Sequence, residues 1–300
     1  MKTWPICVYH KNCLDGIAAA WVVWKYFHGE VALVPCGYGD EPPDVTDRDI
    51  IIVDFSFSLP VMKRLLSACR SMVWIDHHKS ALEGLGELLE HDTFQRLQTM
   101  TGVSSSGCGL AWDFYFPNEP LPNPLTFIQD RDLWKFELPY TKQVTAALFN
   151  EDLTVDLINY AVDSFKDARS TYSCELLATG RALLQAQGRQ VKQLVETNLR
   201  YMQVGSHVVP VVNAPYFLAS EVGNYLVTRD NPFFAATYHD TAKGRFFSLR
   251  SSDRGLDVAE VAKLYGGGGH RNAAGFSRPA GWEGEPTAAD NLLNGLRREA

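Results

Sequence analysis

Residues 49–78, DIIIVDFSFSLPVMKRLLSACRSMVWIDHH, decide the fold class that the sequence predicts. Their first part, residues 49–55, is a β-branched run that suits a strand buried on both faces of a parallel sheet. Residues 58–60, Ser-Leu-Pro, mark a helix start, since proline is tolerated in the first helical turn. Residues 72–75 predict another strand, which runs into the triplet Asp-His-His at 76–78.

The same alternation precedes this stretch. Residues 6–9 form a short apolar run, residues 16–27 are long and alanine-rich enough for a buried helix, and residues 31–35 predict a second strand. Asp15 stands where that helix starts, a position that favours Asp as a cap. A β-α-β-α-β order predicts an α/β fold with a doubly wound parallel sheet.

Chemically reactive side chains follow three of these strands. The first strand ends at His10, the third at Asp54, and the fourth at residues 76–78. In doubly wound sheets, ligands bind beyond the carboxyl ends of the strands. We therefore expect these aspartates and histidines to meet at one edge of the sheet.

Length and composition limit the function classes. A chain of 300 residues is comfortable for two domains, and 46% hydrophobic and 21% charged residues are ordinary for a globular protein. The net charge of −7 argues against a grip on long nucleic acid through many phosphates. The six cysteines form no C-x-x-C pair and predict reduced thiols rather than a zinc ribbon. With no signal peptide and no apolar membrane span evident, we expect a cytoplasmic protein.

The second half of the chain changes pattern. Residues 107–134 are helical in character with a proline-rich break, and residues 171–201 predict a long helix suited to connect two domains. Beyond it, strands are expected at 207–212, 233–238 and 245–250, with helices near 219–229 and 257–265. The expected domains are residues 1–180, a helical connector at 181–205 and a smaller α/β domain at 206–300.

Four clusters carry the candidate chemistry. They are residues 10–16 (HKNCLDG), 53–55 (VDF), 76–79 (DHHK) and 130–132 (DRD). Imidazoles combined with carboxylates suit manganese, iron, cobalt or magnesium better than a structural zinc. The number of carboxylates suggests more than one ion, and two ions ~3.5–4 Å apart would clamp a phosphoryl displacement.

In this order the clusters resemble the DHH phosphoesterase superfamily, which includes RecJ-type exonucleases, nano-RNases and cyclic-dinucleotide phosphodiesterases. Residues 266–276, GGGGHRNAAGF, resemble the signature of the DHH-associated domain. The resemblance implies a parallel-sheet catalytic domain that a helical connector joins to a smaller α/β substrate-binding domain.

The resemblance also implies roles for single residues. His10 would bind a first metal, Asp15 and His77 a second, and Asp54 would bridge both. His78 would face the substrate phosphate or assist without touching the metal, so His78 and Asp54 are the expected catalytic residues.

Two positions stay open. The last carboxylate ligand is either Asp132, where residues 132–136 resemble the family's Asp-x-x-x-Phe pattern, or Asp130. The usual first motif carries two aspartates two residues apart, but here Cys13 stands two positions before Asp15. Cys13 is either a thiolate ligand, the mark of a weak or differently occupied first site, or a packed cysteine.

The second domain is expected to hold the substrate. Glycines let the backbone approach a phosphate closely, and their N–H groups can form an anion-binding nest. Arg250 and Ser251 resemble the family's second phosphate-contact strand. The expected substrate-binding residues are Arg250, Ser251, Gly267, Gly268, Gly269, His270 and Arg271.

Together these features predict a phosphodiesterase that cleaves short oligonucleotides or linear dinucleotides such as pApA or pGpG to nucleoside 5′-monophosphates. The expected cofactor is Mn²⁺, with Mg²⁺ or Co²⁺ as alternatives, at up to two ions. The alternative functions are a 3′,5′-bisphosphonucleotide phosphatase and a non-catalytic nucleotide sensor, which the cysteine at position 13 motivates. A homodimer, the direction of cleavage and the base preference stay open.

Overall fold

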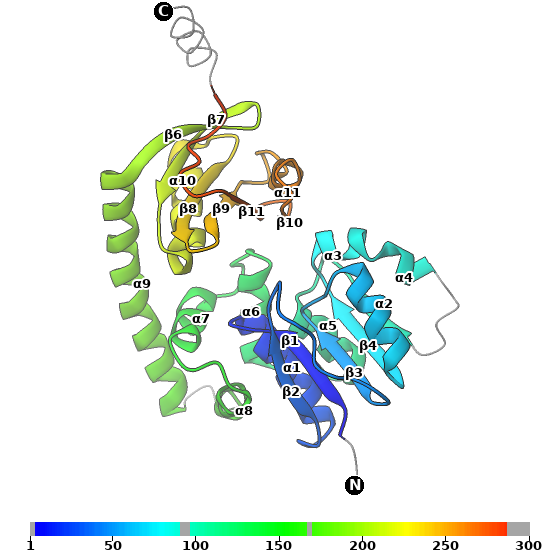
Figure 1. Cartoon of the computed structure of the whole chain (residues 1–300). Helices are drawn as coiled ribbons and strands as arrows, with labels where there is room; N and C mark the ends of the chain where they lie inside the picture. The colour runs from blue at the N-terminus through cyan, green and yellow to red at the C-terminus, as the bar shows by residue number, and fades with distance from the viewer. Residues whose placement is uncertain (1–3, 91–96, 167–169, 287–300) are drawn as a thin grey trace, which may run out of the picture. The chain divides into compact units, whose positions relative to one another are not determined.

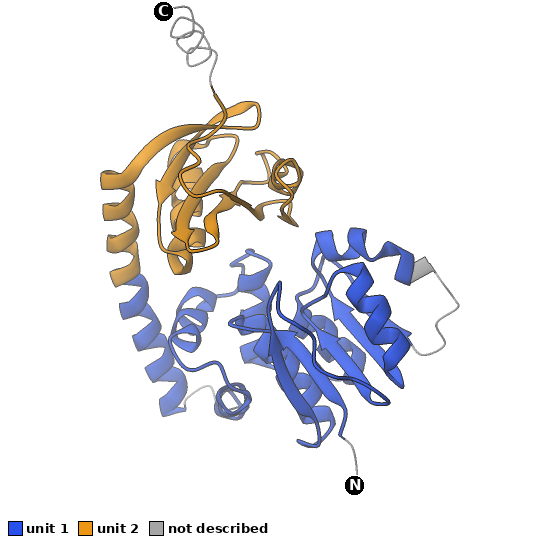
Figure 2. Cartoon of the chain, viewed as in Figure 1, with its two compact units in different colours: residues 1–185 blue, residues 186–300 orange. Residues whose placement is uncertain are grey.

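The computed structural model describes residues 4–90, 97–166 and 170–286, so the outermost residues of the two expected domains lie outside the described ones. The chain divides into two compact units, residues 1–185 and 186–300 (Figure 2). The division falls within the long helix α9 (Thr171–Asn198). Among the described residues, no helix is both long and apolar enough to cross a membrane.

The first unit contains a parallel sheet. Its strands lie in the order β2-β1-β3-β4-β5, and every neighbouring pair is parallel (Figure 1). The bounds are β1 Ile6–His10, β2 Ala32–Cys36, β3 Asp49–Val53, β4 Ser71–Asp76 and β5 Leu97–Thr101. The predicted α/β fold with a parallel sheet is therefore confirmed.

Helices cover both faces of this sheet, which explains the uninterrupted apolar run in β3. Ile50 and Ile52 pack on the side of α2 (Leu59–Ala68). Ile51 and Val53 pack on the opposite side, with α1 (Leu14–Tyr26) and α5 (Gly107–Tyr115). Further helices of the unit are α3 Lys79–Gly84, α4 Gly86–Glu90, α6 Asn123–Asp132, α7 Thr141–Phe149 and α8 Val155–Ser164.

The second unit is built on a mixed sheet in the order β10-β11-β9-β8-β7-β6, in which only the β7–β8 pair is parallel. Helix α11 (Val258–Lys263) packs on one face, and α10 (Ala219–Asp230) with the end of α9 packs on the other. The bounds are β6 Leu199–Val204, β7 His207–Asn213, β8 Ala235–Thr241, β9 Gly244–Arg250, β10 Gly268–His270 and β11 Ala273–Arg278.

The expected helical connector over residues 181–205 is wrong in its last part. The helix ends at Asn198, and β6 follows without a break and pairs antiparallel with β7 along its whole length. Met202 and Val204 of this strand are buried against the α11 face of the sheet. The local sequence predicted that residues 199–204 continue the helical connector. Pairing with β7 makes them a strand instead.

Candidate metal centre

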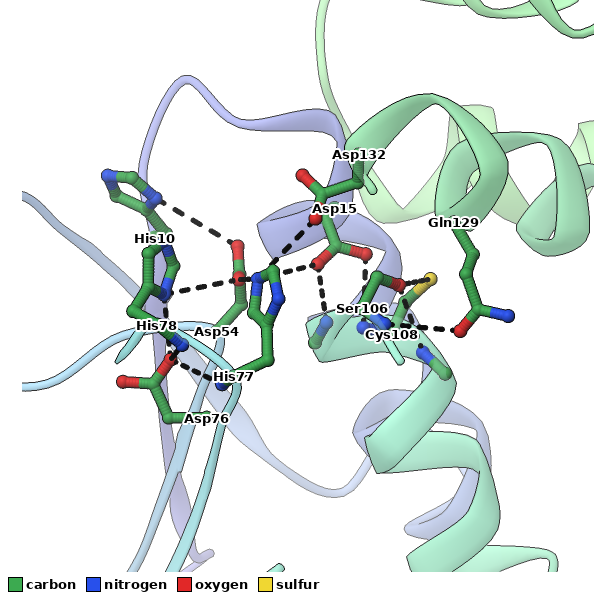
Figure 3. A network of polar contacts seen from close by, with 12 residues as sticks. His10, Asp15, Asp54, Asp76, His77, His78, Ser106, Cys108, Gln129 and Asp132 are labelled. Carbon is green, nitrogen blue, oxygen red and sulfur yellow. Dashed lines mark hydrogen bonds and ion pairs between the residues drawn. The ribbon is translucent and has the colours of Figure 1, made fainter. Parts of the chain in front are cut away.

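Three strand ends of the parallel sheet supply the side chains of the candidate centre (Figure 3). His10 is the last residue of β1, Asp54 directly follows β3, and Asp76 ends β4 and is followed by His77 and His78. Because β1, β3 and β4 are parallel neighbours, their carboxyl ends meet at one edge. The structure brings these five residues together at that edge.

Asp54 lies in the middle of the group and is only 1% exposed. Its Oδ1 lies 3.1 Å from Nε2 of His77, and its Oδ2 lies 3.9 Å from Nδ1 of His10. The backbone φ of Asp54 is +52°, a left-handed conformation that costs a non-glycine residue about 1–3 kcal/mol and is concentrated at functional sites. Its N–H donates to the carbonyl of Ile75 at 2.9 Å, which fixes this turn against β4.

Asp15 lies in the first turn of α1, but its carboxylate is held by α5. It does not cap its own helix, because Cys13 occupies the N-cap position of α1. Its carboxylate instead accepts hydrogen bonds from the N–H groups of Gly107 (2.6 Å) and Cys108 (3.1 Å), at the start of α5. The positive end of a helix stabilises a carboxylate there. This leaves Asp15 Oδ2 3.8 Å from Nε2 of His77.

Gly107 and Cys108 are site residues that the sequence analysis did not single out. A Cβ atom at position 107 would lie 2.5 Å from Cβ of Asp54 and 2.9 Å from Oδ2 of Asp15. Glycine is therefore required where α5 approaches both carboxylates. The available signal was the run Ser-Gly-Cys-Gly at 106–109, a helix start with glycine in its first turn.

The structure separates Asp132 from Asp130. Oδ2 of Asp132 lies 3.5 Å from Nε2 of His77. The carboxylate of Asp130 points elsewhere and accepts hydrogen bonds from the N–H groups of residues 137–138, at 2.9 and 3.1 Å, and from the hydroxyl of Thr141. Asp130 as the alternative metal ligand is therefore wrong, because three internal donors occupy its oxygens.

Asp76 supports His78 rather than the ring of His77. Its Oδ1 accepts hydrogen bonds from the backbone N–H groups of His77 and His78, at 2.8 and 3.2 Å. The same oxygen lies 2.7 Å from the ring nitrogen Nδ1 of His78. Asp76 thus contacts both the backbone N–H of His77 and the ring of His78. A carboxylate at Nδ1 fixes both the tautomer and the ring orientation of a histidine, and so defines which way Nε2 of His78 points.

The electrostatics of the group favour a cation. Burial and the nearby charge of Asp15 raise the pKa of Asp54, and the same two causes raise the pKa of Asp132. Burial, joined by His78, lowers the pKa of His10 to about 4. Burial opposes the charged form of His77, yet the hydrogen bond with Asp54 and the charge of Asp132 outweigh it and raise its pKa to about 10. The carboxyls of Asp15, Asp54 and Asp132 thus all lie around the ring of His77, whose positive charge a divalent ion would supplement.

Unsatisfied ligand atoms fit the same conclusion. Nδ1 of His10 and Oδ2 of Asp54 are buried, and neither has a hydrogen-bond partner within the described part of the chain. Buried polar atoms without a partner are rare and call for an explanation such as an ion. Within the first unit, three sets of potential ligand atoms lie within 4.8 Å of one another, and Asp54 belongs to each: His10, Cys13 and Asp54; Asp15, Asp54 and His77; and Asp54, Asp76 and His78.

Two of the expected substrate-binding side chains, those of Arg250 and Ser251, make hydrogen bonds within the second unit. The guanidinium of Arg250 donates to Oγ of Ser220 at 2.6 Å and to the carbonyl of Leu249 at 2.8 Å, and burial lowers its pKa. The hydroxyl of Ser251 donates to the carbonyl of Leu256 at 2.7 Å. Arg250 and Ser251 therefore hold the end of β9 in place, and their contact with a substrate stays a prediction.

The glycine run is also used structurally. The N–H of Gly267 donates to the carbonyl of Ala262 at 2.9 Å and so ends α11, while residues 268–270 form β10 and pair with β11. Gly269 has φ +143°, and a Cβ there would lie 2.5 Å from the carbonyl oxygen of Ala273. The expected nest of N–H groups is wrong for Gly267, since α11 uses that donor.

His270 and Arg271 follow this run. His270 is the last residue of β10 and stands opposite Ala273 of β11. The guanidinium of Arg271 is directed to the loop after β9, with the carbonyl oxygens of Asp253 and Gly255 at 3.3 and 3.2 Å. The structure thus places both residues beside β10, and leaves their contact with a substrate as a prediction.

Comparisons with known proteins give two sequence relatives. The chain is 28% identical to the oligoribonuclease NrnB of Bacillus subtilis over 215 residues, which cover 68% of this chain and 52% of the relative. It is 25% identical over 298 residues to the uncharacterized protein R106 of Acanthamoeba polyphaga mimivirus, with 91% and 67% covered. The chain therefore spans about half of NrnB and about two thirds of R106. No protein-family model matches it.

Solved structures give further similarities. The pGpG-specific phosphodiesterase PggH of Vibrio cholerae is 14% identical, with 99% of this chain and 98% of that chain covered and a TM-score of 0.49. RecJ of Thermus thermophilus in complex with Mn²⁺ is 12% identical, with 92% and 49% covered and a TM-score of 0.48.

Proposed function

We propose that this DHH-type chain, a relative of the oligoribonuclease NrnB, is a metal-dependent phosphodiesterase. Its substrates are short oligonucleotides or linear dinucleotides of the pApA or pGpG kind, and its products are nucleoside 5′-monophosphates. The observation that carries the proposal is the buried Asp54 carboxylate, which has a histidine near each of its two oxygens and takes part in each of the three ligand groups of the first unit. One carboxylate placed in this way is suited to bridge two ions.

The residues of the centre take distinct roles in this proposal. His10, Asp15, Asp54, His77 and Asp132 hold up to two divalent ions, for which Mn²⁺ is the expected metal and Mg²⁺ or Co²⁺ the alternatives. The ions, when bound, supply Lewis acidity toward the phosphoryl oxygens. The start of α5 holds the carboxylate of Asp15 in place through two N–H groups.

His78 moves the proton. Its Nδ1 is held by Asp76 at 2.7 Å, so its Nε2 is the nitrogen that exchanges a proton with the substrate or an attacking water. The pKa of His78 is raised, because the hydrogen bond with Asp76 and the charge of Asp54 outweigh the effect of burial. When it carries the proton, His78 also stabilises negative charge that develops on the phosphoryl group.

The test is turnover of labelled substrates two to five nucleotides long in the presence of Mn²⁺, with a 3′,5′-bisphosphonucleotide as the competing substrate. We expect 5′-monophosphates from the oligonucleotides. The variants Asp54→Asn and His77→Ala should lose about a thousand-fold or more in kcat, because metal ions supply several kcal/mol of stabilisation and each 1.36 kcal/mol is ten-fold in rate.

A matched control is Asp113→Asn, which changes an exposed carboxylate on α5 that belongs to none of the ligand groups. It should retain full activity. Phosphate release from the bisphosphonucleotide alone would favour the phosphatase alternative. Saturable nucleotide binding without any product would favour a sensor, and unchanged activity in Asp54→Asn would refute the metal assignment.

A further inference from the structure

The loop between β1 and α1 brings Cys13 back beside His10. Asn12 adopts a left-handed conformation with φ +55°, which asparagine tolerates better than most residues. The N–H of Lys11 donates to the carbonyl of Cys36 at 2.9 Å and ties the loop to the neighbouring strand β2. The chain therefore reverses within three residues, and both side chains reach the same edge of the sheet.

Gly16 allows this close approach. A Cβ atom at this position would lie 2.3 Å from the carbonyl oxygen of His10, so no other residue fits without moving the loop. As a result, α1 starts directly against the end of β1. Sγ of Cys13, a ring nitrogen of His10 and a carboxylate oxygen of Asp54 form one group whose members all lie within 4.8 Å of one another.

Two of these three partners are unsatisfied. Oδ2 of Asp54 and Nδ1 of His10 are buried, 3.9 Å apart, and without a hydrogen-bond partner among the residues that the structure describes. That separation is too long for a hydrogen bond. It is compatible with two ligands of one ion, because metal–ligand distances of about 2.0–2.3 Å allow them up to about 4.5 Å apart. The side chain of Cys13 accepts no capping hydrogen bond from α1, although Cys13 is the N-cap residue.

We infer that Cys13 is a metal ligand: its sulfur, a nitrogen of His10 and a carboxylate oxygen of Asp54 hold one divalent ion. The inference rests on the proposed function and deepens it. On binding, the thiol releases its proton to solvent, and the sulfur coordinates as a thiolate. The group around Asp15, Asp54 and His77 has only oxygen and nitrogen ligands. The centre therefore contains one group with a soft sulfur ligand and one group with only oxygen and nitrogen ligands, and the two groups share Asp54.

This asymmetry has a consequence for metal choice. A thiolate ligand favours Co²⁺, Fe²⁺ or Zn²⁺ over Mg²⁺, whereas carboxylates and imidazole suit Mn²⁺ and Mg²⁺. The two ligand groups therefore prefer different metal ions. Replacing the sulfur by a carboxylate, as in Cys13→Asp, shifts the first group towards Mg²⁺ and Mn²⁺.

A purely structural role for Cys13 makes the opposite prediction. Ser and Asp are better N-cap residues than most, so Cys13→Ser and Cys13→Asp should preserve or improve the start of α1. Both variants are therefore expected to fold, which circular dichroism and Tm would verify. If Cys13 were only a packed N-cap residue, Cys13→Ser would leave the coordination of a bound ion unchanged.

The experiment is a cobalt titration of the metal-free full chain, followed by absorption spectroscopy and calorimetry. Wild-type protein should show a near-ultraviolet sulfur-to-cobalt charge-transfer band that saturates with the first equivalent. Cys13→Ser and Cys13→Asp should lose this band. Cys13→Ser should also lower cobalt affinity by at least about 10–100-fold, the loss known for groups that support metal ligands.

Matched controls separate Cys13 from the other thiols. Cys174→Ser removes the exposed thiol, and Cys36→Ser removes a buried thiol at the end of β2. Both should keep the band. A band that survives in Cys13→Ser, or saturable cobalt binding by wild-type protein with no such band, would overturn the inference.

Failure of this inference and of the proposed function can be told apart. Oligonucleotide cleavage without the charge-transfer band leaves the phosphodiesterase intact and removes Cys13 from its ligands. A band that depends on Cys13, in a chain that cleaves none of the substrates, supports the ligand and refutes the enzyme.

Discussion

At the scale of single residues, the centre depends on positions where the backbone has little freedom. Asp54, which directly follows β3, adopts a left-handed backbone conformation, and Asn12 does the same in the loop that carries Cys13. Gly16 and Gly107 stand where any side chain would meet the residues of the centre. These four positions determine where the ligands lie, although three of them contribute no ligand atom of their own.

Gly107→Ala tests this dependence. The new Cβ would meet Asp54 at 2.5 Å, so either α5 or the carboxylate has to shift. We expect a loss of about 1–3 kcal/mol in the free energy of unfolding, the usual cost of overpacking, together with weaker Mn²⁺ binding and slower turnover. Urea unfolding and calorimetry measure the two effects.

Gly188→Ala is the matched control, because a Cβ there meets nothing within 4 Å. In the interior of α9 it should stabilise the chain by about 0.5–1 kcal/mol. Equal metal affinity in wild type and Gly107→Ala would show that the close approach of α5 has no role in the centre.

At the scale of elements, the segment between α6 and α7 is organised by one carboxylate. Asp130 accepts hydrogen bonds from the N–H groups of residues 137–138 and from Thr141. Its carbonyl accepts the N–H of Lys135 at 2.9 Å. The aromatic residues of this segment need such support, since Trp134, Phe136 and Tyr140 all have positive φ. Asp130 therefore fixes the C-terminal end of α6, where Asp132 faces His77.

Asp130→Asn should weaken this segment in a pH-dependent way. Burial opposes ionisation of Asp130, but hydrogen bonds from Thr141 and residues 137–138 outweigh it and hold the pKa below its usual value. A carboxyl with a lowered folded-state pKa stabilises the fold above its unfolded value, near 3.8, and this contribution disappears as the pH falls through the folded value. We expect a loss of about 1–3 kcal/mol at pH 7.

The measurement is the Tm difference between wild type and Asp130→Asn from pH 7 to pH 3. The difference should shrink below about pH 4, as Asp130 of the wild type becomes protonated. A difference that stays constant over this range would mean that the charge of Asp130 does not hold the segment.

At the scale of the whole molecule, the centre stores unfavourable charge that a metal would relieve. Asp54 and Asp132 have raised folded-state pKa values, so their contribution to stability is present below the unfolded value and is lost as the pH rises through the folded value. The metal-free chain is therefore penalised at neutral pH at this edge of the sheet. The same carboxylates, once ionised, are the ligands that an ion requires.

Metal removal should thus lower stability most at neutral pH. At 100 times its dissociation constant, an ion that binds only the folded chain adds about 2.7 kcal/mol. We expect Mn²⁺ to raise the Tm clearly at pH 7.5 and much less at pH 5, where protons compete for the two carboxyls. Differential scanning calorimetry with and without chelator measures this. A chelator effect as large at pH 5, or as large in Asp54→Asn, would contradict it.

The sequence by itself determined the parallel sheet and the edge at which its reactive residues gather. The runs at residues 49–55 and 72–75 could bury apolar side chains on both faces only as central parallel strands, and parallel strands place their carboxyl ends together. The DHH resemblance followed from the Asp-His-His triplet and the distant glycine run, and similarity to NrnB agrees with it.

Only the tertiary structure decided which atoms face one another. It placed Asp132 in the centre and Asp130 in the loop, showed the ring of His78 as a partner of Asp76, and revealed Gly107 as the close neighbour of two carboxylates. It also turned part of the expected connector into β6. The physical reason is the same in each case: hydrogen bonds and close contacts between residues far apart in the chain leave no periodic signal in the local sequence.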